Sequence, residues 1–498
     1  MKILFAASEC VPFCKTGGLA DVVGALPKAL RQARHDVRII LPKYKTIRAH
    51  EFGLKDTGEK VHVPVGAGWR DGRIYQAKVE PNLTVYFIEN EHYYGRAGIY
   101  RSHEGDYADN AERFIFFSRA VLEACKALEF RPDIVHAHDW QTGLVPAYLK
   151  TLYKRDAFFQ HTASVFTIHN IAYQGYFPKE TMSLAGLPWD EFHLNGLEFY
   201  GHMNFMKAGL IYSDVLSTVS PSYAREIQSG PVFGRALEGV LRSRSKDLAG
   251  ILNGLDIDEW NPVKDPFLAK PFDREHLSDR RENKTHLQQS LKLTVDPRAP
   301  MLGIVARLDM QKGLDLVAQI IPDLMKRGVQ VALLGQGDLV LQRQYEALAK
   351  RFPRQFHYSS EFNEPLAHYI YAGSDLFLMP SRFEPCGLSQ MIAMRYGSIP
   401  VATATGGLLD TVSPFGPGDT GTGFMFYDST PAALMKEITH ALSVFQDEPV
   451  WTALQHRAMN TDFSWTNSAQ KYVSLYRRAL GHRSPGRAGR RQSPKNTH

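Results

Sequence analysis

Apolar runs of strand length recur through the first half of the chain and alternate with stretches of helical periodicity. The runs are rich in β-branched or aromatic residues and cover residues 3–7, 37–41, 83–88, 134–137, 165–168 and 215–219. Helix-like stretches at residues 21–32 and 110–128 lie between several of them. This alternation predicts βαβ units and a parallel sheet.

A second series of apolar runs covers residues 302–306, 329–334, 375–379 and 399–402. Helical patterns again separate the runs, so the sequence predicts a second α/β domain. A chain of 498 residues is long enough for two domains of about 200 to 250 residues each. The proline-rich and charged segment 262–298 is expected to form irregular surface structure that opens the second domain.

We therefore expect a Rossmann-like domain over residues 1–248 and a second one over residues 249–465. A helix over residues 466–482 should cross back to the first domain. Residues 483–498 are rich in Arg, Pro, Gly and Ser, which predicts a disordered basic tail. Because ligands bind beyond the carboxyl ends of strands in open α/β sheets, the site is expected in a cleft between the two domains.

Charge and cysteine content exclude several classes of protein. The net charge is +6, but the last sixteen residues carry five positive charges and no acid, so the remainder carries +6 − 5 = +1. No basic folded domain is left to bind nucleic acid. Four scattered cysteines (Cys10, Cys14, Cys125 and Cys386) do not suit a disulfide framework or a four-cysteine metal site. No apolar run is long enough for a bilayer, and we expect a cytoplasmic protein.

The sequence Thr-Gly-Gly-Leu-x-Asp-x-Val occurs twice, once at residues 16–23 and again at residues 405–412. Each copy follows an apolar run and leads into a helix-like stretch, so its free backbone N–H groups could face an anion. Two such turns suggest one phosphorylated ligand held between two lobes, with Lys15 adding a cation beside the first. The alternative is that each Gly-Gly pair only makes a tight turn before a helix.

Charged residues follow two strands of the second predicted domain. Arg307 and Lys312 lie five positions apart after the run 302–306, a spacing that suits the two phosphates of a diphosphate. Glu384 follows the run 375–379, beside Pro385 and Gly387. A carboxylate at this position could accept hydroxyl hydrogen bonds from a sugar, or it could act only as a charge partner for a helix N-terminus.

Polar residues also follow two strands of the first predicted domain, in the segments His136-Ala-His-Asp139-Trp140 and His169-Asn170. A His-x-His pair could hold a metal, but no third ligand has a suitable spacing. A sugar site fits better, with Trp140 and the Tyr93, Tyr94 and Tyr100 group as possible stacking surfaces. Asp256-Ile-Asp258 follows no clear strand, and we interpret it as a turn.

Seven segments in order resemble the bacterial glycogen synthases and plant starch synthases, which are retaining glycosyltransferases of the two-domain GT-B fold. The matching segments are KTGGLADV from Lys15, HAHDW from His136, TIHNIAYQG from Thr167, NGLDIDEWNP from Asn253, ARLDMQKGLDL from Ala306, SRFEPCGLSQ from Ser381 and TGGLLDTV from Thr405. The resemblance covers residues 1 to about 480. It implies transfer of glucose from ADP-glucose to the non-reducing 4-hydroxyl of an α-1,4-glucan, with retention and release of ADP.

The resemblance also implies roles for individual residues. Arg307 and Lys312 would hold the diphosphate, Glu384 would bind the glucose hydroxyls, and His169 and Asp139 would complete the catalytic set. The residues implied on the ADP-glucose side are Lys15, Gly17, Gly18, Asp21, Asn170, Asn253, Cys386, Gly387, Thr405, Gly406 and Gly407. Tyr93 and Trp140 are expected on the acceptor side. No cofactor and no essential metal are expected.

The chain departs from the family pattern at a few positions. Ala306 stands where relatives often have Ser, Asp309-Met310 is a loop variant, and Ala404 precedes the second Thr-Gly-Gly where many relatives carry Arg. Families with a Glu-x7-Glu motif would need Glu at position 392, which is Ile392 here. The alternative functions are a sugar-nucleotide epimerase, another GT-B glycosyltransferase that uses UDP-glucose, and a non-catalytic glucan-binding protein.

Overall fold

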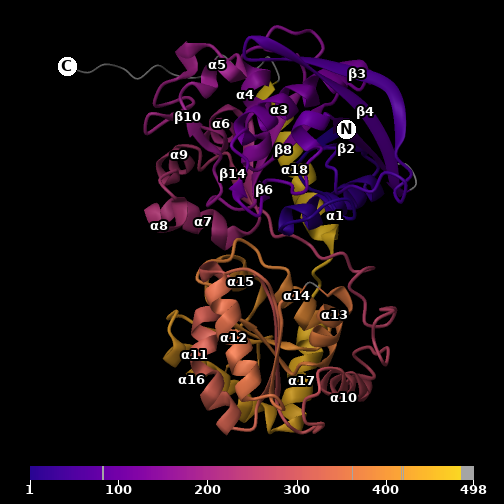
Figure 1. The fold of residues 1–498 in the computed structure, drawn as a ribbon, viewed down its shortest axis with the longest axis vertical. Helices are drawn as coiled ribbons and strands as arrows, with labels where there is room; N and C mark the ends of the chain where they lie inside the picture. Colours follow the sequence, from indigo (N-terminus) through magenta and orange to yellow (C-terminus); the bar gives the residue numbers. More distant parts are fainter. Residues whose placement is uncertain (81–82, 362, 417, 419, 484–498) are drawn as a thin grey trace, which may run out of the picture. The chain divides into compact units, whose positions relative to one another are not determined.

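The computed structural model describes residues 1–80, 83–361, 363–416, 418 and 420–483, and its chain divides into two compact units (Figure 1). The first unit consists of Met1–Val219, Ala224–Gly254 and the last helix, α18 (Trp465–Arg483); the second consists of Ser220–Tyr223 and Leu255–Ser464. The boundary expected after residue 248 instead falls inside a strand of the first unit, β14 (Leu248–Gly250). Of the expected tail, Arg483 ends α18 and residues 484–498 lie outside the described residues.

A nine-stranded sheet forms the core of the first unit. Its seven consecutive strands from β14 to β5 run parallel to one another. The strand order is β14, β13 (Val215–Thr218), β9 (Ala163–Ile168), β8 (Ile134–His138), β1 (Lys2–Ala6), β2 (Asp36–Pro42), β5 (Leu83–Glu89), β4 (Gly68–Glu80) and β3 (Lys55–Val65). All six predicted runs of this half are strands of the parallel part. The sheet therefore brings the loops after β1, β8 and β9 to one edge.

The ribbon of β3 and β4 did not emerge from the apolar pattern. These two strands pair antiparallel with each other, and β4 pairs antiparallel with β5. Most of the first half of β3 is exposed, and burial alternates only from Val61 to Val65. Strands with one solvated face carry charges at alternate positions, so they lack the continuous apolar run that marked the buried strands.

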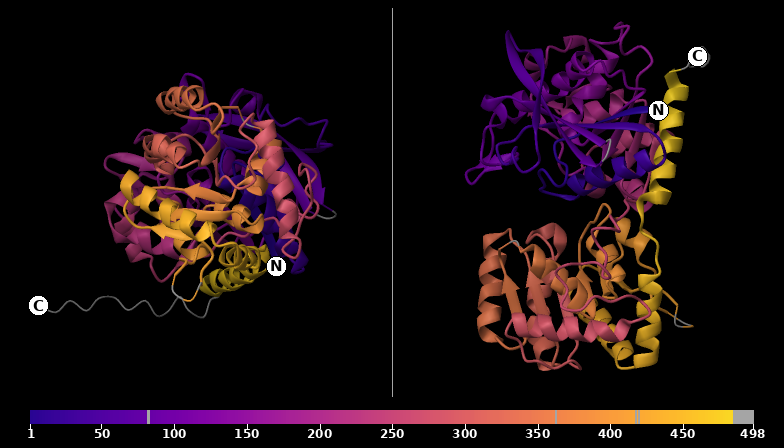
Figure 2. Two further views of the ribbon diagram at one scale, coloured as in Figure 1. Left: turned by 90° about the horizontal axis from the view of Figure 1, so that it is seen from below. Right: turned by 90° about the vertical axis from the view of Figure 1, so that its right-hand side faces the viewer.

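Helices cover the sheet of the first unit, and α18 returns to it from the end of the chain. The helices are α1 (Gly18–Gln32), α2 (Glu91–Tyr94), α3 (Asn110–Ala127), α4 (Leu144–Lys150), α5 (Thr181–Ala185), α6 (Phe205–Tyr212), α7 (Pro221–Ser229), α8 (Pro231–Gly234) and α9 (Glu238–Ser243). A small antiparallel sheet has the strand order β10 (Tyr176–Pro178), β12 (His202–Asn204) and β11 (Glu198–Phe199). Figure 2 shows α18 running along the first unit. The Tyr476 hydroxyl of this helix lies 2.9 Å from His136 Nδ1.

The second unit is a six-stranded parallel sheet with helices on both faces (Figure 1). The strand order is β17 (Phe356–Ser359), β16 (Gln330–Leu334), β15 (Met301–Val305), β18 (Leu376–Met379), β19 (Ile399–Thr403) and β20 (Phe424–Phe426). The helices are α10 (Arg280–Ser290), α11 (Leu314–Lys326), α12 (Leu339–Arg351), α13 (Glu364–Gly373), α14 (Ser389–Arg395), α15 (Gly406–Thr411), α16 (Pro431–Phe445) and α17 (Glu448–Met459). The four predicted runs are β15, β16, β18 and β19.

The segment expected to be irregular, residues 262–298, contains helix α10. Two cations of α10 are buried: Lys284 Nζ lies 2.6 Å from Asp375 Oδ2, and Arg280 Nε donates to the Tyr396 carbonyl at 2.6 Å. Charged residues with buried partners give no amphipathic pattern, which is why the sequence suggested a surface loop. In the part of the chain that the structure describes, no helix is long and apolar enough to cross a membrane.

Candidate active site

The first Thr-Gly-Gly turn lies at the N-terminus of α1, and its amides already hold an anion. Glu9, in the loop after β1, accepts hydrogen bonds from the backbone N–H of Thr16 and of Gly17, the latter at 3.2 Å, and from the Thr16 hydroxyl at 2.6 Å. The Tyr100 hydroxyl donates to the same carboxylate at 2.6 Å. The expectation that these two N–H groups are free is therefore wrong in this conformation. Sequence reasoning missed Glu9, an acid seven positions before the turn that could have been tested as its partner.

Two residues expected to bind the donor, Lys15 and Asp21, pair with each other. Lys15 Nζ lies 2.7 Å from Asp21 Oδ1, and the side chains are 52% and 24% exposed. Burial raises the pKa of Asp21, while the Lys15 charge and hydrogen bond oppose that rise. A half-exposed lysine can exchange this carboxylate for a phosphate oxygen at small cost, because exposed ion pairs contribute little.

Asp139, His169 and Asn170 come together at the ends of β8 and β9. Asp139 Oδ1 accepts the backbone N–H of His169 at 2.7 Å and that of Asn170 at 3.5 Å. Asp139 has a φ of 53°, a backbone conformation that residues other than glycine rarely adopt. Burial raises the pKa of its carboxyl to about 7, against the two backbone hydrogen bonds that lower it. This carboxyl can therefore change protonation state near neutral pH.

The remaining predicted residues of the first unit occupy different environments. Trp140 is half-buried, and its ring packs on Phe114, with centroids 4.9 Å apart. Asn253 is 5% exposed, and its buried Oδ1 has no hydrogen-bond partner among the described residues. An unfilled acceptor of this kind suits a ligand contact, because buried polar atoms otherwise have partners.

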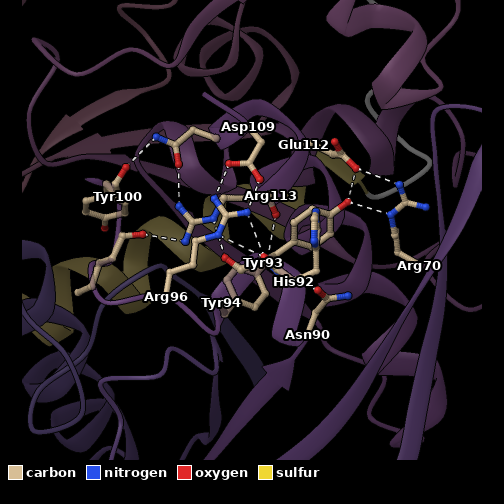
Figure 3. A network of polar contacts seen from close by, with 12 residues as sticks. Arg70, Asn90, His92, Tyr93, Tyr94, Arg96, Tyr100, Asp109, Glu112 and Arg113 are labelled. Atoms are coloured by element: carbon tan, nitrogen blue, oxygen red, sulfur yellow. Dashed lines mark hydrogen bonds and ion pairs between the residues drawn. The ribbon is translucent and has the colours of Figure 1, made fainter. Parts of the chain in front are cut away.

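Tyr93 and Tyr94 are not stacking surfaces, because both side chains are fully buried. Figure 3 shows the network that holds them: the Tyr93 hydroxyl donates to Glu112, and Arg113 Nε donates to the Tyr93 carbonyl at 2.8 Å. The Tyr94 hydroxyl donates to the Arg113 carbonyl at 2.9 Å. The expected acceptor-side role of Tyr93 is therefore corrected to a core role. A tyrosine pattern cannot reveal burial, since tyrosine is common in both environments.

In the second unit, Lys312 and Glu384 form a partly buried ion pair in the loops that follow β15 and β18. Lys312 Nζ lies 2.6 Å from Glu384 Oε2, with side chains 18% and 7% exposed, and the Ser381 hydroxyl donates to the same oxygen at 2.9 Å. Asp309 Oδ1 accepts the Lys312 N–H at 2.9 Å and so fixes the short helix that carries the lysine. The pair places one cation and one carboxylate side by side, and these groups can bind a phosphate and a hydroxyl respectively.

Arg307 is placed differently from Lys312. Its guanidinium lies 3.5 Å from Asp309 Oδ2, and its side chain is 51% exposed. Both cations lie in the loop between β15 and α11, but they pair with different carboxylates. Asp309, one of the family departures, thus contacts both predicted phosphate-binding residues.

The second Thr-Gly-Gly turn positions Glu384 through its backbone. The Gly407 N–H donates to the Glu384 carbonyl at 2.9 Å. This amide is therefore not free, contrary to the prediction. A methyl group on Gly407 would overlap the Cys386 backbone. Gln390, which sequence reasoning also missed, donates to the Cys386 and Gly387 carbonyls at 3.1 and 3.0 Å. These contacts fix the loop after β18, in which Gly387 has a φ of 74°.

Two lesser expectations concern metal. Asp256 Oδ1 accepts the N–H groups of Asp258 and Glu259 at 3.2 and 3.3 Å, so the Asp-x-Asp segment is the turn that we interpreted it to be. Within the described ranges, no three His, Cys, Asp or Glu side chains are grouped to hold a metal ion.

Both halves of the chain match family models. Residues 2–243 match the starch synthase catalytic domain, and residues 288–447 match glycosyl transferases group 1. The chain is 46% identical over 483 residues to a glycogen synthase of Syntrophotalea carbinolica, covering 96% of this chain and 99% of that protein. It is 45% identical to a glycogen synthase of Elusimicrobium minutum, covering 96% and 100%.

Solved structures agree with the sequence matches. The catalytic domain of starch synthase IV from Arabidopsis thaliana, bound to ADP and acarbose, superposes with a TM-score of 0.90 at 36% identity, covering 96% of this chain and 99% of that one. A sucrose-phosphate synthase from Thermosynechococcus elongatus, at 18% identity and a TM-score of 0.61, shares the fold. The two largely parallel sheets, the polar loops at their strand ends and these near-complete matches together show that the chain belongs to the glycogen and starch synthase family of GT-B glucosyltransferases.

Proposed function

We propose that this chain transfers glucose from ADP-glucose to the non-reducing 4-hydroxyl of an α-1,4-glucan, with retention of anomeric configuration and release of ADP. The observation that carries the proposal is the partly buried Lys312–Glu384 pair in the loops after two adjacent strands, in a chain whose starch synthase neighbour was solved with ADP and acarbose. The cation suits the leaving diphosphate, and the carboxylate suits the glucose hydroxyls.

The chemistry breaks a glycosyl–phosphate bond, so negative charge grows on the diphosphate while the sugar becomes oxocarbenium-like. Arg307 and Lys312 stabilise the leaving group, and preorganised donors of this kind are worth about 3 to 4 kcal/mol each. Glu384, held by Ser381 and Lys312, accepts hydrogen bonds from the sugar. The other ligand contacts in the second unit come from Cys386, Gly387, Thr405, Gly406 and Gly407.

Residues of the first unit complete the reaction in this proposal. Lys15 releases Asp21 to take a donor phosphate oxygen, while Glu9 keeps the Gly17 and Gly18 turn in place. His169 and Asn170 flank the glucose, Asn253 uses its unfilled Oδ1, and Asp139 and Trp140 lie on the acceptor side.

The proposed mechanism has no covalent glucosyl–enzyme intermediate. The acceptor hydroxyl attacks the face that the diphosphate leaves, and the departing phosphate takes its proton, unlike the two-carboxylate retaining hydrolases. Trapping a glucosyl ester on Asp139 or Glu384 by rapid quench and mass spectrometry would overturn this route.

Incubation of the purified full chain with ADP-[14C]glucose and glycogen tests the overall reaction. Label is expected in the ethanol-precipitated glucan and should be released by an enzyme that cleaves α-1,4 bonds. An epimerase would need no glucan, and its label would stay soluble as an altered sugar. A non-catalytic glucan-binding protein would leave the donor intact.

The nucleotide preference is tested by competition between ADP-glucose and UDP-glucose at equal concentration. We expect the ADP sugar to be consumed first, as the family membership supports. Preferential consumption of UDP-glucose would leave the transfer reaction in place but revise the donor.

A further inference from the structure

Two histidine rings face each other behind the catalytic loop of the first unit. His138, the last residue of β8, places Nδ1 3.0 Å from Nε2 of His169, which directly follows β9. His138 is fully buried, whereas His169 keeps 8% of its surface exposed. Of the two residues, only His169 therefore has surface that a ligand could contact.

Both rings are neutral, so the bridge between them holds one proton. Burial lowers the pKa of His169 to about 3, and burial with the neighbouring His136 and His169 lowers that of His138 well below its usual value. A neutral imidazole carries N–H on one nitrogen only. Either His138 donates from Nδ1 to a bare Nε2 of His169, or His169 donates from Nε2 to a bare Nδ1 of His138.

The far nitrogen of His138 distinguishes these two arrangements. His138 Nε2 is buried, and the described residues offer it no hydrogen-bond partner. If His169 donated the bridge, His138 would carry its own proton on Nε2 and bury an N–H group without an acceptor. Orphaned buried N–H groups are rarer in folded proteins than unfilled acceptors. The first arrangement leaves only a bare nitrogen there, beside the ring of Phe5.

We propose that His138 is a positioning residue that donates from Nδ1 to His169 Nε2 and thereby holds His169 in the tautomer with its proton on Nδ1. His169 then presents an N–H donor, and not a bare nitrogen, to an oxygen of the bound ligand. The use made of this donor rests on the proposed function, whereas the tautomer belongs to the free protein.

Nitrogen-15 NMR of the full chain labelled at histidine tests the tautomer directly. The chain has 19 histidines, so the two rings are assigned from the resonances lost in His138→Asn and His169→Asn. Both rings should show a protonated Nδ1 and a bare Nε2 from pH 6 to 8. A protonated Nε2 on His169 would overturn the proposal, whether or not the enzyme makes glucan.

Two substitutions at His138 separate positioning from a general loss of packing. Asn places an amide nitrogen close to the Nδ1 position and can donate to His169, whereas Leu of similar size cannot. His138→Leu should shift the His169 resonances to a tautomer mixture and lower kcat about 10-fold or more, the scale for groups that orient a functional histidine. His138→Asn should keep most of the wild-type His169 tautomer and most of the wild-type kcat.

The exposed residue His161 supplies a matched control, since His161→Leu should change neither readout. Equal thermal unfolding of the Asn and Leu variants would show that packing does not explain their difference. If His138→Leu leaves the His169 tautomer unchanged, the positioning role is wrong. If His169 carries its proton on Nδ1 in the wild type but no variant changes glucan synthesis, the proposed role of His169 in the reaction is wrong instead.

Discussion

At the scale of single residues, Glu384 combines two demands that work against each other. It is 5% exposed, so its carboxylate needs the Lys312 ammonium and the Ser381 hydroxyl as partners, yet the same carboxylate is proposed to bind the sugar. An uncompensated buried charge costs several kcal/mol, so Lys312 and Glu384 depend on each other for placement.

We expect Glu384→Ala to lower kcat at least about 100-fold, because it removes one preorganised contact to the transition state. Initial rates of glucan synthesis at saturating donor measure this loss. Glu346→Ala, at an exposed site on α12, is the matched control and should keep full activity. A Glu384→Ala enzyme within tenfold of the wild type would remove Glu384 from the catalytic set.

The raised pKa of Asp139 predicts that the free energy of unfolding depends on pH. Its pKa rises from a usual 3.8 to about 7 on burial, so the folded state binds this proton more tightly than the unfolded state. The stabilisation is complete below about pH 4 and is lost as the pH rises to 7, on the order of 4 kcal/mol in total.

Asp139→Asn removes the ionisation and keeps an oxygen for the two backbone donors. We expect the variant to gain stability relative to the wild type between pH 4 and pH 8, as measured by urea denaturation. Asp190→Asn, at an exposed carboxylate, is the control. Parallel stability curves for the wild type and Asp139→Asn would contradict the raised pKa.

At the scale of elements, the two copies of the Thr-Gly-Gly motif do different work. Gly18 opens α1 and has no atom within 4 Å of an added Cβ, whereas its counterpart Gly407 lies against the Cys386 backbone. The first turn binds the side chain of Glu9, and the second binds the main chain of Glu384. The same Thr-Gly-Gly sequence therefore gives one helix start that holds a carboxylate and one that fixes the loop carrying Glu384.

Gly407→Ala should lower both the stability of the second unit and the activity, because the new methyl must displace the loop that carries Glu384. We expect a cost of about 1 to 3 kcal/mol, the range for overpacking. Thermal unfolding and initial rates measure the two effects. Gly239→Ala on α9 meets no atom within 4 Å and should be neutral or slightly stabilising. Equal behaviour of the two variants would argue against the close packing.

At the scale of the whole molecule, the first unit is assembled from segments far apart in the chain. Helix α18 buries Tyr472 and Tyr476 and gives His136 a partner, and its Ser468 hydroxyl donates to the Leu252 carbonyl at 2.5 Å. Without this helix, the buried His136 Nδ1 and the apolar surface beneath the tyrosines would face water.

Residues 1–254 expressed alone should therefore unfold at a lower temperature than residues 1–254 joined by a flexible linker to residues 465–483. Loss of a buried hydrogen bond alone costs about 1 to 3 kcal/mol, and the exposed tyrosines add to it. Circular dichroism melting compares the two proteins. A Tyr476→Phe variant of the linked protein isolates the His136 contact, and unchanged melting in all three would contradict the role of α18.

The apolar pattern predicted ten of the fifteen described strands of the two large sheets, because strands buried on both faces appear as continuous apolar runs; it did not predict β3, β4, β14, β17 or β20. All ten predicted runs are strands, and most predicted site residues lie at the ends of those strands. The same logic failed for β3, β4 and α10, whose charged residues are either solvated or paired internally. Single-residue patterns could not distinguish buried Tyr93 from a stacking surface.

By itself, the sequence determined the α/β class, the family and which polar loops follow the strands, since these depend on periodicity and on residues adjacent in the chain. The tertiary structure alone decided which groups face each other. Lys312 with Glu384 and His138 with His169 are pairs that lie on, or in the loops after, separate strands. Their partnerships depend on strand order and register, which bring distant loops to one sheet edge and which local sequence does not encode.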